Sequence, residues 1–414
     1  MESRTLTNVG LDHTTTHAPS ETDAGASPLP RGIRGATVLQ VLPALVTGGV
    51  ERGAVDIAEA IVAAGGRAIV ASAGGPMVTE LNRARAEHVT LPLDSKNPLV
   101  IFKNIDRLAE LIVRENVDIV HARSRAPAWS AYRAARDAGR PFLTTYHGTY
   151  GHRNALKRWY NSVMVKGERV IAISDFIAGH IRQIYGVPSS RIRVIPRGVD
   201  MIRFDSHNIS QERVINLAQR WRLPDGMPVV MLPGRLTRWK GQIIFIEAIE
   251  KLGRRDIQCL LVGSDQGREG YRRELEQEIE RRGLNNIMHV IDDCNDMPAA
   301  YMLTDLVISA STDPEAFGRV IVEAQALGRP VVATDHGGAR ETVIENVTGW
   351  LTPPGDAQAL ADAIGLALTL DGQQRQNLSK RAIEHIRANY TKELMSKRTL
   401  DVYNELLRER SAGR

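Results

Sequence analysis

One stretch decides the fold of this chain: Asp313-Pro314-Glu315-Ala316-Phe317-Gly318-Arg319-Val320-Ile321-Val322-Glu323. The short apolar run 306–309 before it predicts a buried strand, and Asp313-Pro314 predicts a turn. Apolar residues recur at helical spacing in 317–327, so we expect a helix that begins near Phe317. Backbone N–H groups at a helix N-terminus lack partners, and a glycine there leaves room for an anion. The stretch therefore predicts a phosphate site.

Two carboxylates flank this predicted site. Glu315 lies on the turn before the helix, and Glu323 lies well inside it. A carboxylate accepts hydrogen bonds from paired hydroxyl groups, so one glutamate could hold a sugar and the other a ribose. The alternative is a surface helix with two ordinary solvated glutamates.

Glu315 and Glu323, with seven residues between them and a Phe-Gly pair inside, resemble the two-glutamate motif of the family 4 retaining glycosyltransferases. The resemblance covers roughly residues 37–390. It implies the GT-B fold, an α/β architecture in which two Rossmann-like domains with parallel sheets face each other across a cleft. It also implies a C-terminal helix that crosses back to the first domain.

Length and composition agree with two globular domains. The chain has 414 residues, 43% hydrophobic and 24% charged, which favours two domains of about 180 residues each. No apolar run reaches the roughly 18 residues of a membrane span. We expect four segments: a disordered leader (1–35), an N-terminal acceptor-side domain (36–205), a C-terminal nucleotide-sugar-binding domain (206–390) and a returning helix (391–414).

Strand and helix patterns alternate along the first half of the chain. This alternation predicts a parallel sheet with helices on both faces, and in such sheets ligands bind at the carboxyl ends of the strands. The predicted strands are 36–42, 68–71, 117–121, 142–146 and 170–173, and the predicted helices are 54–64, 101–114 and 126–138.

Gly48-Gly49 and His147 are the candidate donor-side residues of the first domain. The glycine pair follows the first predicted strand, where it would let a ligand approach the backbone, although a generic strand–helix turn explains it equally well. His147 follows another strand, where a structural histidine is the ordinary alternative. The resemblance implies that Gly48-Gly49 lies near the donor phosphates and that His147 bonds a hydroxyl of the donor sugar.

The first domain is the basic part of the chain. Residues 101–200 contain 17 Lys or Arg and 8 Asp or Glu, a net charge of +9, whereas the whole chain carries +5. An anionic membrane surface or a phosphorylated lipid-linked acceptor would fit this charge. A solvated basic face is the alternative, and no nucleic-acid motif accompanies the charge, so we expect no nucleic acid partner. The acceptor-side or membrane candidates are His121, Arg123, Lys157, Arg158 and Trp159.

Arg235 and Lys240 follow the predicted strand 229–232 and direct two cations at one place, which suits a diphosphate. The resemblance assigns them to the donor diphosphate, while two unrelated surface cations are the alternative. Asp292 and Asp293 form an acidic loop without a metal-binding pattern. The resemblance implies metal-independent transfer, so we expect no metal and no cofactor besides the sugar nucleotide itself.

The sequence thus predicts a retaining, metal-independent hexosyltransferase. It would move a hexose from a UDP- or GDP-sugar to a hydroxyl of a glycan or anionic lipid-linked acceptor, in envelope polysaccharide or lipopolysaccharide core synthesis. We expect it in the cytoplasm or at the cytoplasmic face of the inner membrane. The alternatives are a GT-B-fold nucleotide-sugar epimerase or hydrolase and a non-catalytic sugar-nucleotide-binding protein.

Each candidate has a predicted role. The predicted catalytic residues are Glu315, His147, Arg235 and Lys240. The predicted donor-binding residues are Gly48, Gly49, Arg235, Lys240, Phe317, Gly318, Arg319 and Glu323.

Overall fold

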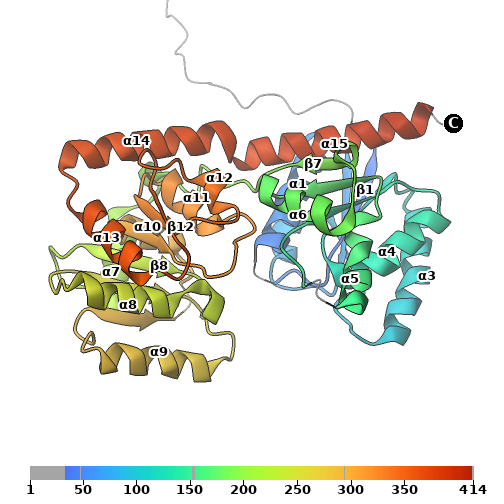
Figure 1. The fold of residues 1–414 in the computed structure, drawn as a ribbon. Helices are drawn as coiled ribbons and strands as arrows, with labels where there is room; N and C mark the ends of the chain where they lie inside the picture. Colours follow the sequence, from blue (N-terminus) through green and yellow to red (C-terminus); the bar gives the residue numbers. More distant parts are fainter. Residues whose placement is uncertain (1–32, 47, 152–153, 293, 413–414) are drawn as a thin grey trace, which may run out of the picture.

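Two parallel β-sheets form the centres of two lobes (Figure 1). The computed structural model describes residues 33–46, 48–151, 154–292 and 294–412. The first sheet has seven strands in the order β3-β2-β1-β4-β5-β6-β7, and the second has six in the order β10-β9-β8-β11-β12-β13. The predicted boundary at 205/206 falls in the segment that joins them, and residues 1–32 of the predicted leader lie outside the described residues.

The strands match the predicted apolar runs to within one or two residues at most ends. Residues of β1, β5, β8 and β9 are buried throughout, because helices cover both faces of each sheet. In the first sheet the strands are β1 (Thr37–Val41), β2 (Arg67–Ser72), β3 (Glu87–Thr90), β4 (Ile119–Ala122), β5 (Phe142–Tyr146), β6 (Arg169–Ala172) and β7 (Ile192–Val194). In the second they are β8 (Val229–Pro233), β9 (Gln258–Val262), β10 (Met288–Ile291), β11 (Leu306–Ser309), β12 (Val331–Thr334) and β13 (Trp350–Thr352).

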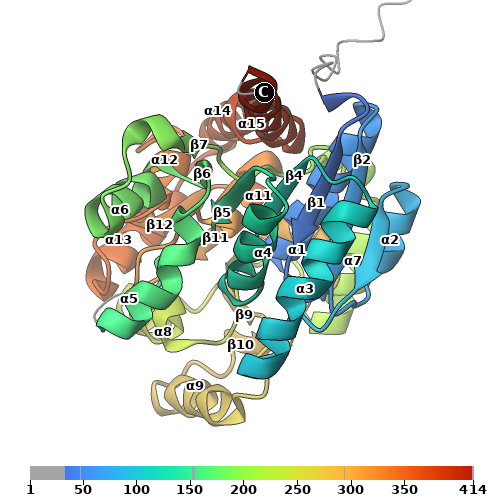
Figure 2. The same ribbon diagram turned by 90° about the vertical axis from the view of Figure 1, so that its right-hand side faces the viewer.

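Helices pack on both faces of the sheets, and α3, α4 and α5 lie together on one side of the first lobe (Figure 2). None of the described helices is long and apolar enough to cross a membrane. In the first domain the helices are α1 (Gly49–Ala63), α2 (Val78–Arg83), α3 (Pro98–Arg114), α4 (Arg125–Asp137), α5 (Ala155–Asn161) and α6 (Asp175–Tyr185). The helices that follow are α7 (Gln211–Trp221), α8 (Gln242–Leu252), α9 (Glu269–Arg281), α10 (Met297–Leu303), α11 (Arg319–Ala326), α12 (Ala339–Thr342), α13 (Ala357–Leu368), α14 (Gly372–Asn389) and α15 (Lys392–Ala412).

The last helix crosses back to the first domain, as predicted. α14 lies on the second lobe and α15 continues along the first, where it packs against α1 (Figure 1). The hydroxyl of Tyr403 lies 2.7 Å from His121 Nδ1, and Glu405 pairs with Arg169 and Arg193 of the first sheet. The two-domain α/β architecture with a returning C-terminal helix is therefore confirmed.

The polar segment 205–226 contains α7, which packs against α10. Two local predictions about helices differ from the structure. The helix predicted at 54–64 begins at Gly49, so Gly48 and Gly49 are the N-cap and first residue of α1. The helix expected near Phe317 begins at Arg319 instead. Gly318 is its N-cap with φ +84°, a left-handed conformation that stops the helical turn from extending further back.

Candidate active site

The predicted site residues gather at the carboxyl ends of neighbouring central strands. β1 neighbours β4 in the first sheet, and β8 neighbours β11 in the second. At these two pairs the strand order reverses, and open parallel sheets generally bind ligands at such switch points. Gly48-Gly49 follows β1 and Arg235 follows β8, while Glu315 follows β11. The topology thus brings the motifs of both domains to the switch points of their sheets.

Glu315 and Lys240 form a shielded ion pair. Lys240 lies in a short turn before α8 and donates to Glu315 Oε1, and each side chain is only 13% exposed. Ser311 Oγ donates to the same carboxylate oxygen at 2.8 Å. A positive charge and a carboxylate with a free second oxygen therefore lie side by side between β8 and β11.

The segment before α11 supplies backbone groups rather than side chains. Phe317 is 4% exposed and packs edge-on against Tyr390, with ring centroids 5.7 Å apart. Its aromatic ring is thus part of the core, and only its backbone and that of Gly318 face the start of α11. The anion site at this helix N-terminus stays a prediction.

Glu323 is held by two partners inside α11 and α10. Arg319 Nε lies 2.8 Å from Glu323 Oε1 one helical turn away, and the hydroxyl of buried Tyr301 donates to Oε2 at 3.1 Å. The side chain of Glu323 is 11% exposed. Its carboxylate is therefore oriented in advance, with lone pairs left for a further donor.

His147, at the end of β5, has two buried ring nitrogens without a hydrogen-bond partner among the described residues. Burial lowers the pKa of His147 well below its usual range, and the charges of Arg197 and Arg123 act in the same direction. The ring is therefore neutral at physiological pH, with one N–H donor and one acceptor nitrogen available. Buried polar atoms without partners are rare in folded proteins, so the two ring nitrogens of His147 are candidates for contact with a ligand.

Arg235 contrasts with Lys240. Its guanidinium is exposed, and within the described part of the chain it forms no recorded ion pair or side-chain hydrogen bond. Its carbonyl oxygen accepts a bond from Gln242 Nε2 at 2.9 Å, which fixes the backbone before α8. Arg235 is thus an exposed cation on the loop that leads from β8 to Lys240.

The two domains contact each other directly around α6. Ser174 Oγ caps α6 and also donates to the carbonyl oxygen of Ala316, at 2.6 Å. Glu341 accepts bonds from the backbone N–H groups of Asp175 and Phe176, at 2.8 and 2.7 Å. A carboxylate of the second domain therefore occupies the N-terminus of a helix of the first domain. Ser174 is thus both the N-cap of α6 and a contact between the two domains.

Two family models match the chain. The model described as Glycosyltransferase Family 4 matches residues 47–203, and the one described as Glycosyl transferases group 1 matches residues 215–385. A solved structure of a glycosyltransferase from Rickettsia africae is 39% identical, with a TM-score of 0.84, over 90% of this chain and 99% of that one.

This chain belongs to glycosyltransferase family 4.

Two further relatives carry named ligands or activities. The structure of Anabaena Alr3699/HepE in complex with UDP-glucose is 27% identical, with a TM-score of 0.78, over 89% of this chain and 99% of that one. The D-inositol 3-phosphate glycosyltransferase of Xylanimonas cellulosilytica is 29% identical over 272 residues, 62% of this chain. That match spans 65% of the relative's length, slightly less than two thirds.

Arg197 is a site residue of this family 4 member that the sequence did not indicate. It follows β7 in the run Pro196-Arg197-Gly198, and its Nη2 donates to the carbonyl oxygen of Gly49. Burial lowers the pKa of Arg197 to about 9, with the charges of Arg123 and Arg319 as further causes. A single arginine in the turn after a strand gives no periodic pattern in the sequence. Only the folded structure shows that Arg197 contacts Gly49 at the start of α1.

His121 and Arg123 are both buried, which corrects the acceptor-side or membrane assignment of His121. His121 is 0% exposed, and its second ring nitrogen lies 2.7 Å from Thr145 Oγ1. Both ring nitrogens are therefore occupied, one by Tyr403 and one by Thr145, so this histidine joins β4 to β5 and α15 and cannot contact a membrane. Arg123 is 3% exposed and donates to Gln40 Oε1 at 2.6 Å.

The other basic candidates lie on the surface of α5. Lys157 and Arg158 are exposed, and Trp159 is 59% exposed while it stacks on Trp129 at 4.9 Å. In the acidic loop of the second domain, Asp292 pairs with Arg272, and Asp293 lies outside the described residues. Over the described ranges, no cluster of three or more His, Cys, Asp or Glu side chains could hold a metal ion.

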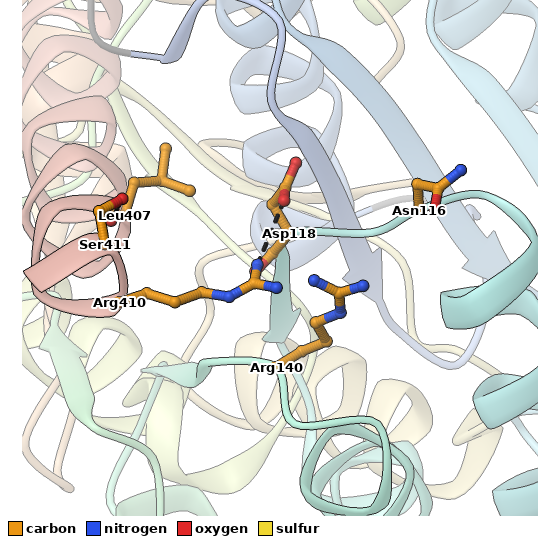
Figure 3. A pocket seen from close by; sticks show the side chains of 6 residues that line it. All are labelled: Asn116, Asp118, Arg140, Leu407, Arg410 and Ser411. Atoms are coloured by element: carbon orange, nitrogen blue, oxygen red, sulfur yellow. Dashed lines mark hydrogen bonds and ion pairs between the residues drawn. The ribbon is translucent and has the colours of Figure 1, made fainter. Parts of the chain in front are cut away.

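A separate pocket lies at the opposite edge of the first sheet (Figure 3). Asp118 and Arg140 precede β4 and β5, so this pocket is at the amino ends of the strands. Arg410 of α15 pairs with Asp118 at 3.2 Å. The pocket contains none of the residues of the family motifs, and we assign no part of the reaction to it.

Proposed function

We propose that this protein is a retaining glycosyltransferase that moves a hexose from a UDP- or GDP-sugar to a hydroxyl of a glycan or glycolipid acceptor. The observation that carries the proposal is the shielded Lys240–Glu315 pair, with the exposed Arg235 on the same loop five residues before Lys240. Cations for a diphosphate and a carboxylate for sugar hydroxyls lie next to each other at a switch point, where the two halves of a sugar nucleotide would lie.

The proposed catalysis is electrostatic. As the bond between the sugar and the diphosphate breaks, negative charge grows on the departing oxygen. Lys240, Arg235 and the backbone N–H groups at the start of α11 would stabilise that charge in a shielded site, where such interactions are stronger than in water. The acceptor hydroxyl would attack on the face that the diphosphate leaves, and a donor phosphate oxygen would take its proton. No metal ion is required in this scheme.

His147 and Glu315 would orient the sugar. The lowered pKa of His147 keeps its ring neutral, so it is suited to a hydrogen bond with a sugar hydroxyl and not to proton transfer at neutral pH. Glu315 offers the carboxylate oxygen that Lys240 and Ser311 leave free. Contacts that tighten as the transition state forms raise the turnover rate, which is the role proposed for both residues.

Glu323 would bind the ribose of the donor. It lies one to two turns into α11, and its carboxylate is oriented by Arg319 and Tyr301 before any ligand arrives. Ribose contacts change little during the reaction, so Glu323 would contribute mainly to donor affinity.

The acceptor is proposed to be anionic and lipid-linked, in envelope polysaccharide or lipopolysaccharide core synthesis. Helices α3 and α5 lie on the same side of the first lobe (Figure 2). Each carries exposed apolar side chains, namely Leu99 and Phe102 in α3 and Leu156 and Trp159 in α5, at 59% to 73% exposed. Lys157 and Arg158 stand between those of α5. Apolar side chains with neighbouring cations are typical of surfaces that bind anionic membranes. We therefore propose peripheral membrane association through this face.

The proposed function is tested by binding and product analysis. UDP, GDP and their hexose conjugates are screened for thermal stabilisation, since a ligand that binds the native state raises its stability. The stabilising donor is then incubated with glycolipid acceptors, and products are identified by mass spectrometry. A transferred sugar supports the proposal. Free sugar or an epimer without transfer would favour the epimerase or hydrolase alternative, and binding without turnover would favour a non-catalytic protein.

Membrane association is tested with vesicles. Sedimentation with vesicles of phosphatidylglycerol and phosphatidylethanolamine should capture the protein, and Trp159→Ser should weaken capture. Vesicles of phosphatidylcholine alone are the control for the charge requirement. Equal binding to both vesicle types would contradict the proposed role of Lys157 and Arg158.

A further inference from the structure

Two arginines of the first domain, the buried Arg123 and the half-buried Arg197, lack a carboxylate partner among the described residues. Arg123 donates through Nε to Gln40 Oε1 at 2.6 Å, and Arg197 donates through Nη2 to the carbonyl oxygen of Gly49. Across the residues that the structure describes, no Asp or Glu forms an ion pair with either one. A buried cation without a counter-charge is costly, because the carbonyl oxygens around it replace only part of its hydration.

Glycines at positions 49 and 53 make room for these side chains. A Cβ atom on Gly53 would collide with Arg197 Nη1 and would lie 3.6 Å from Arg123 Nη1. Gly53 lies within α1, where glycine weakens a helix by roughly 1 kcal/mol relative to alanine. The passage of Arg197 across the helix explains why a glycine occurs there.

A third arginine reaches the same place from the second domain. A Cβ atom on Gly49 would lie 3.5 Å from Arg197 Nη2 and 3.6 Å from Arg319 Nη1. Arg319 Nε is paired with Glu323, but its Nη1 is turned toward the glycine loop. Three guanidinium groups from two domains thus lie beside the first two turns of α1. Arg123, Arg197 and Arg319 are called the arginine site below.

The carboxylates near Arg197 do not offset its burial and the two neighbouring arginines. Asp56 and Glu51 of α1 lie close enough to favour the charged form of Arg197, yet burial and the two other arginines outweigh them and lower its pKa to about 9. Burial also raises the pKa of Asp56 to about 6, which weakens its value as a counter-ion under mildly acidic conditions.

We propose that the arginine site binds a phosphate or carboxylate group carried by the acceptor. This inference rests on the proposed function, and it names the residues that would select an anionic acceptor. Guanidinium groups bind such anions through paired N–H donors. The donor diphosphate has cations of its own in Arg235 and Lys240, which follow β8 of the second domain.

The position of the site fits an acceptor. Two of its three arginines belong to the first domain, and both act electrostatically on His147, the residue proposed to contact the donor sugar. An anion there would stand on the acceptor's side of the reacting sugar. Because Arg319 comes from the second domain, the same anion would also draw the two domains together.

The inference is tested with inorganic phosphate as the probe. Protein is first saturated with UDP or GDP, whichever binds, and phosphate is then titrated by calorimetry at low ionic strength. We expect saturable binding that Arg197→Gln weakens by at least about tenfold, since charge-assisted bonds are lost. Arg197→Lys keeps the positive charge but lacks the paired N–H donors of a guanidinium, so its affinity for phosphate should fall less than that of Arg197→Gln. Arg133→Gln is the matched control. It removes the same charge from the same domain, but at a side chain that is 61% exposed.

Several results would overturn the inference. Phosphate that displaces the nucleotide would assign the arginine site to the donor diphosphate. The same conclusion follows if Arg197→Gln weakens nucleotide binding as much as Lys240→Met does. Absence of phosphate binding to the nucleotide-saturated protein, or equal binding by both Arg197 variants and the wild type, would also refute it. A protein that binds neither nucleotide counts against the proposed function instead, and titration without nucleotide still decides whether an anion binds at these arginines.

Discussion

Replacement of Lys240 by methionine should separate a catalytic role from a structural one. Methionine retains the length and apolar stem of lysine but leaves Glu315 without its cation. Both side chains are 13% exposed, and only Ser311 Oγ remains as a partner of the carboxylate oxygen. Removing one member of a buried ion pair typically costs about 3 to 5 kcal/mol, because the remaining charge is desolvated and unpaired.

The residual bond from Ser311 and the slight exposure place the expected cost at the lower end, about 3 kcal/mol. For a domain of roughly 180 residues, that corresponds to a fall in Tm of about 6 to 12 °C. Turnover should fall at least tenfold and by up to about a thousandfold, the usual range when a donor to a departing oxyanion is lost. Thermal unfolding followed by circular dichroism and initial rates of sugar transfer measure the two effects separately.

Arg235→Ala is the matched comparison. Arg235 is exposed and has no recorded carboxylate partner in the described chain, so its removal should lower turnover at least tenfold without a comparable fall in Tm. The double variant Lys240→Met/Glu315→Gln should recover most of the lost stability, because a neutral amide needs no cation. Near wild-type turnover in both single variants would refute the diphosphate assignment. An equal fall in Tm for Arg235→Ala would refute the reasoning from burial.

Four further predictions follow from the site. Glu315→Gln should mainly lower the turnover rate, whereas Glu323→Gln should mainly raise the donor KM, and steady-state kinetics showing the reverse pattern would mean that the donor lies in the opposite direction along α11. His147→Asn should lower turnover by about 2- to 10-fold, the value of one hydrogen bond. The pH–rate profile between pH 6 and 8 should neither gain nor lose a step, because the lowered pKa of His147 leaves its ring uncharged throughout that range. Transfer should persist in excess EDTA, and a loss of activity that magnesium or manganese restores would contradict the metal-independent scheme. Glu341→Ala removes two bonds to the N-terminus of α6, at 2.8 and 2.7 Å, so it should loosen domain contact and increase the radius of gyration measured by small-angle scattering; an unchanged radius would show that the remaining contacts suffice.

Local patterns in the sequence were sufficient for most of the secondary structure. Apolar runs of four to six residues became the buried strands, and β11 occurs at the predicted residues 306–309. Where prediction failed, the cause was also local. Gly318 adopts a left-handed conformation that delays α11. The sequence of α7, in contrast, does indicate a helix, because Val214, Leu217, Ala218 and Trp221 recur at helical spacing after the N-cap Ser210.

The fate of individual site residues was less predictable. His121 ends one predicted strand and His147 follows another. Both ring nitrogens of His121 have hydrogen-bond partners, whereas neither ring nitrogen of His147 has one within the described residues. The difference depends on Tyr403, 282 positions away in the chain, which reaches His121 and not His147. No pattern near either histidine carries that information.

By itself, the sequence determined the elements, their parallel arrangement and the motif residues Glu315, Glu323, Arg235 and Lys240, because each depends on residues close together in the chain. Periodicity, turn-forming residues and motif spacing operate over about ten residues. Tertiary structure decided which side chains meet. The pair of Lys240 with Glu315 joins positions 75 apart, and the contact of Arg197 with Gly49 joins positions 148 apart. Such contacts exist only after the sheets form and their switch points bring separate loops to one edge, so the arginine site became visible only in the folded chain.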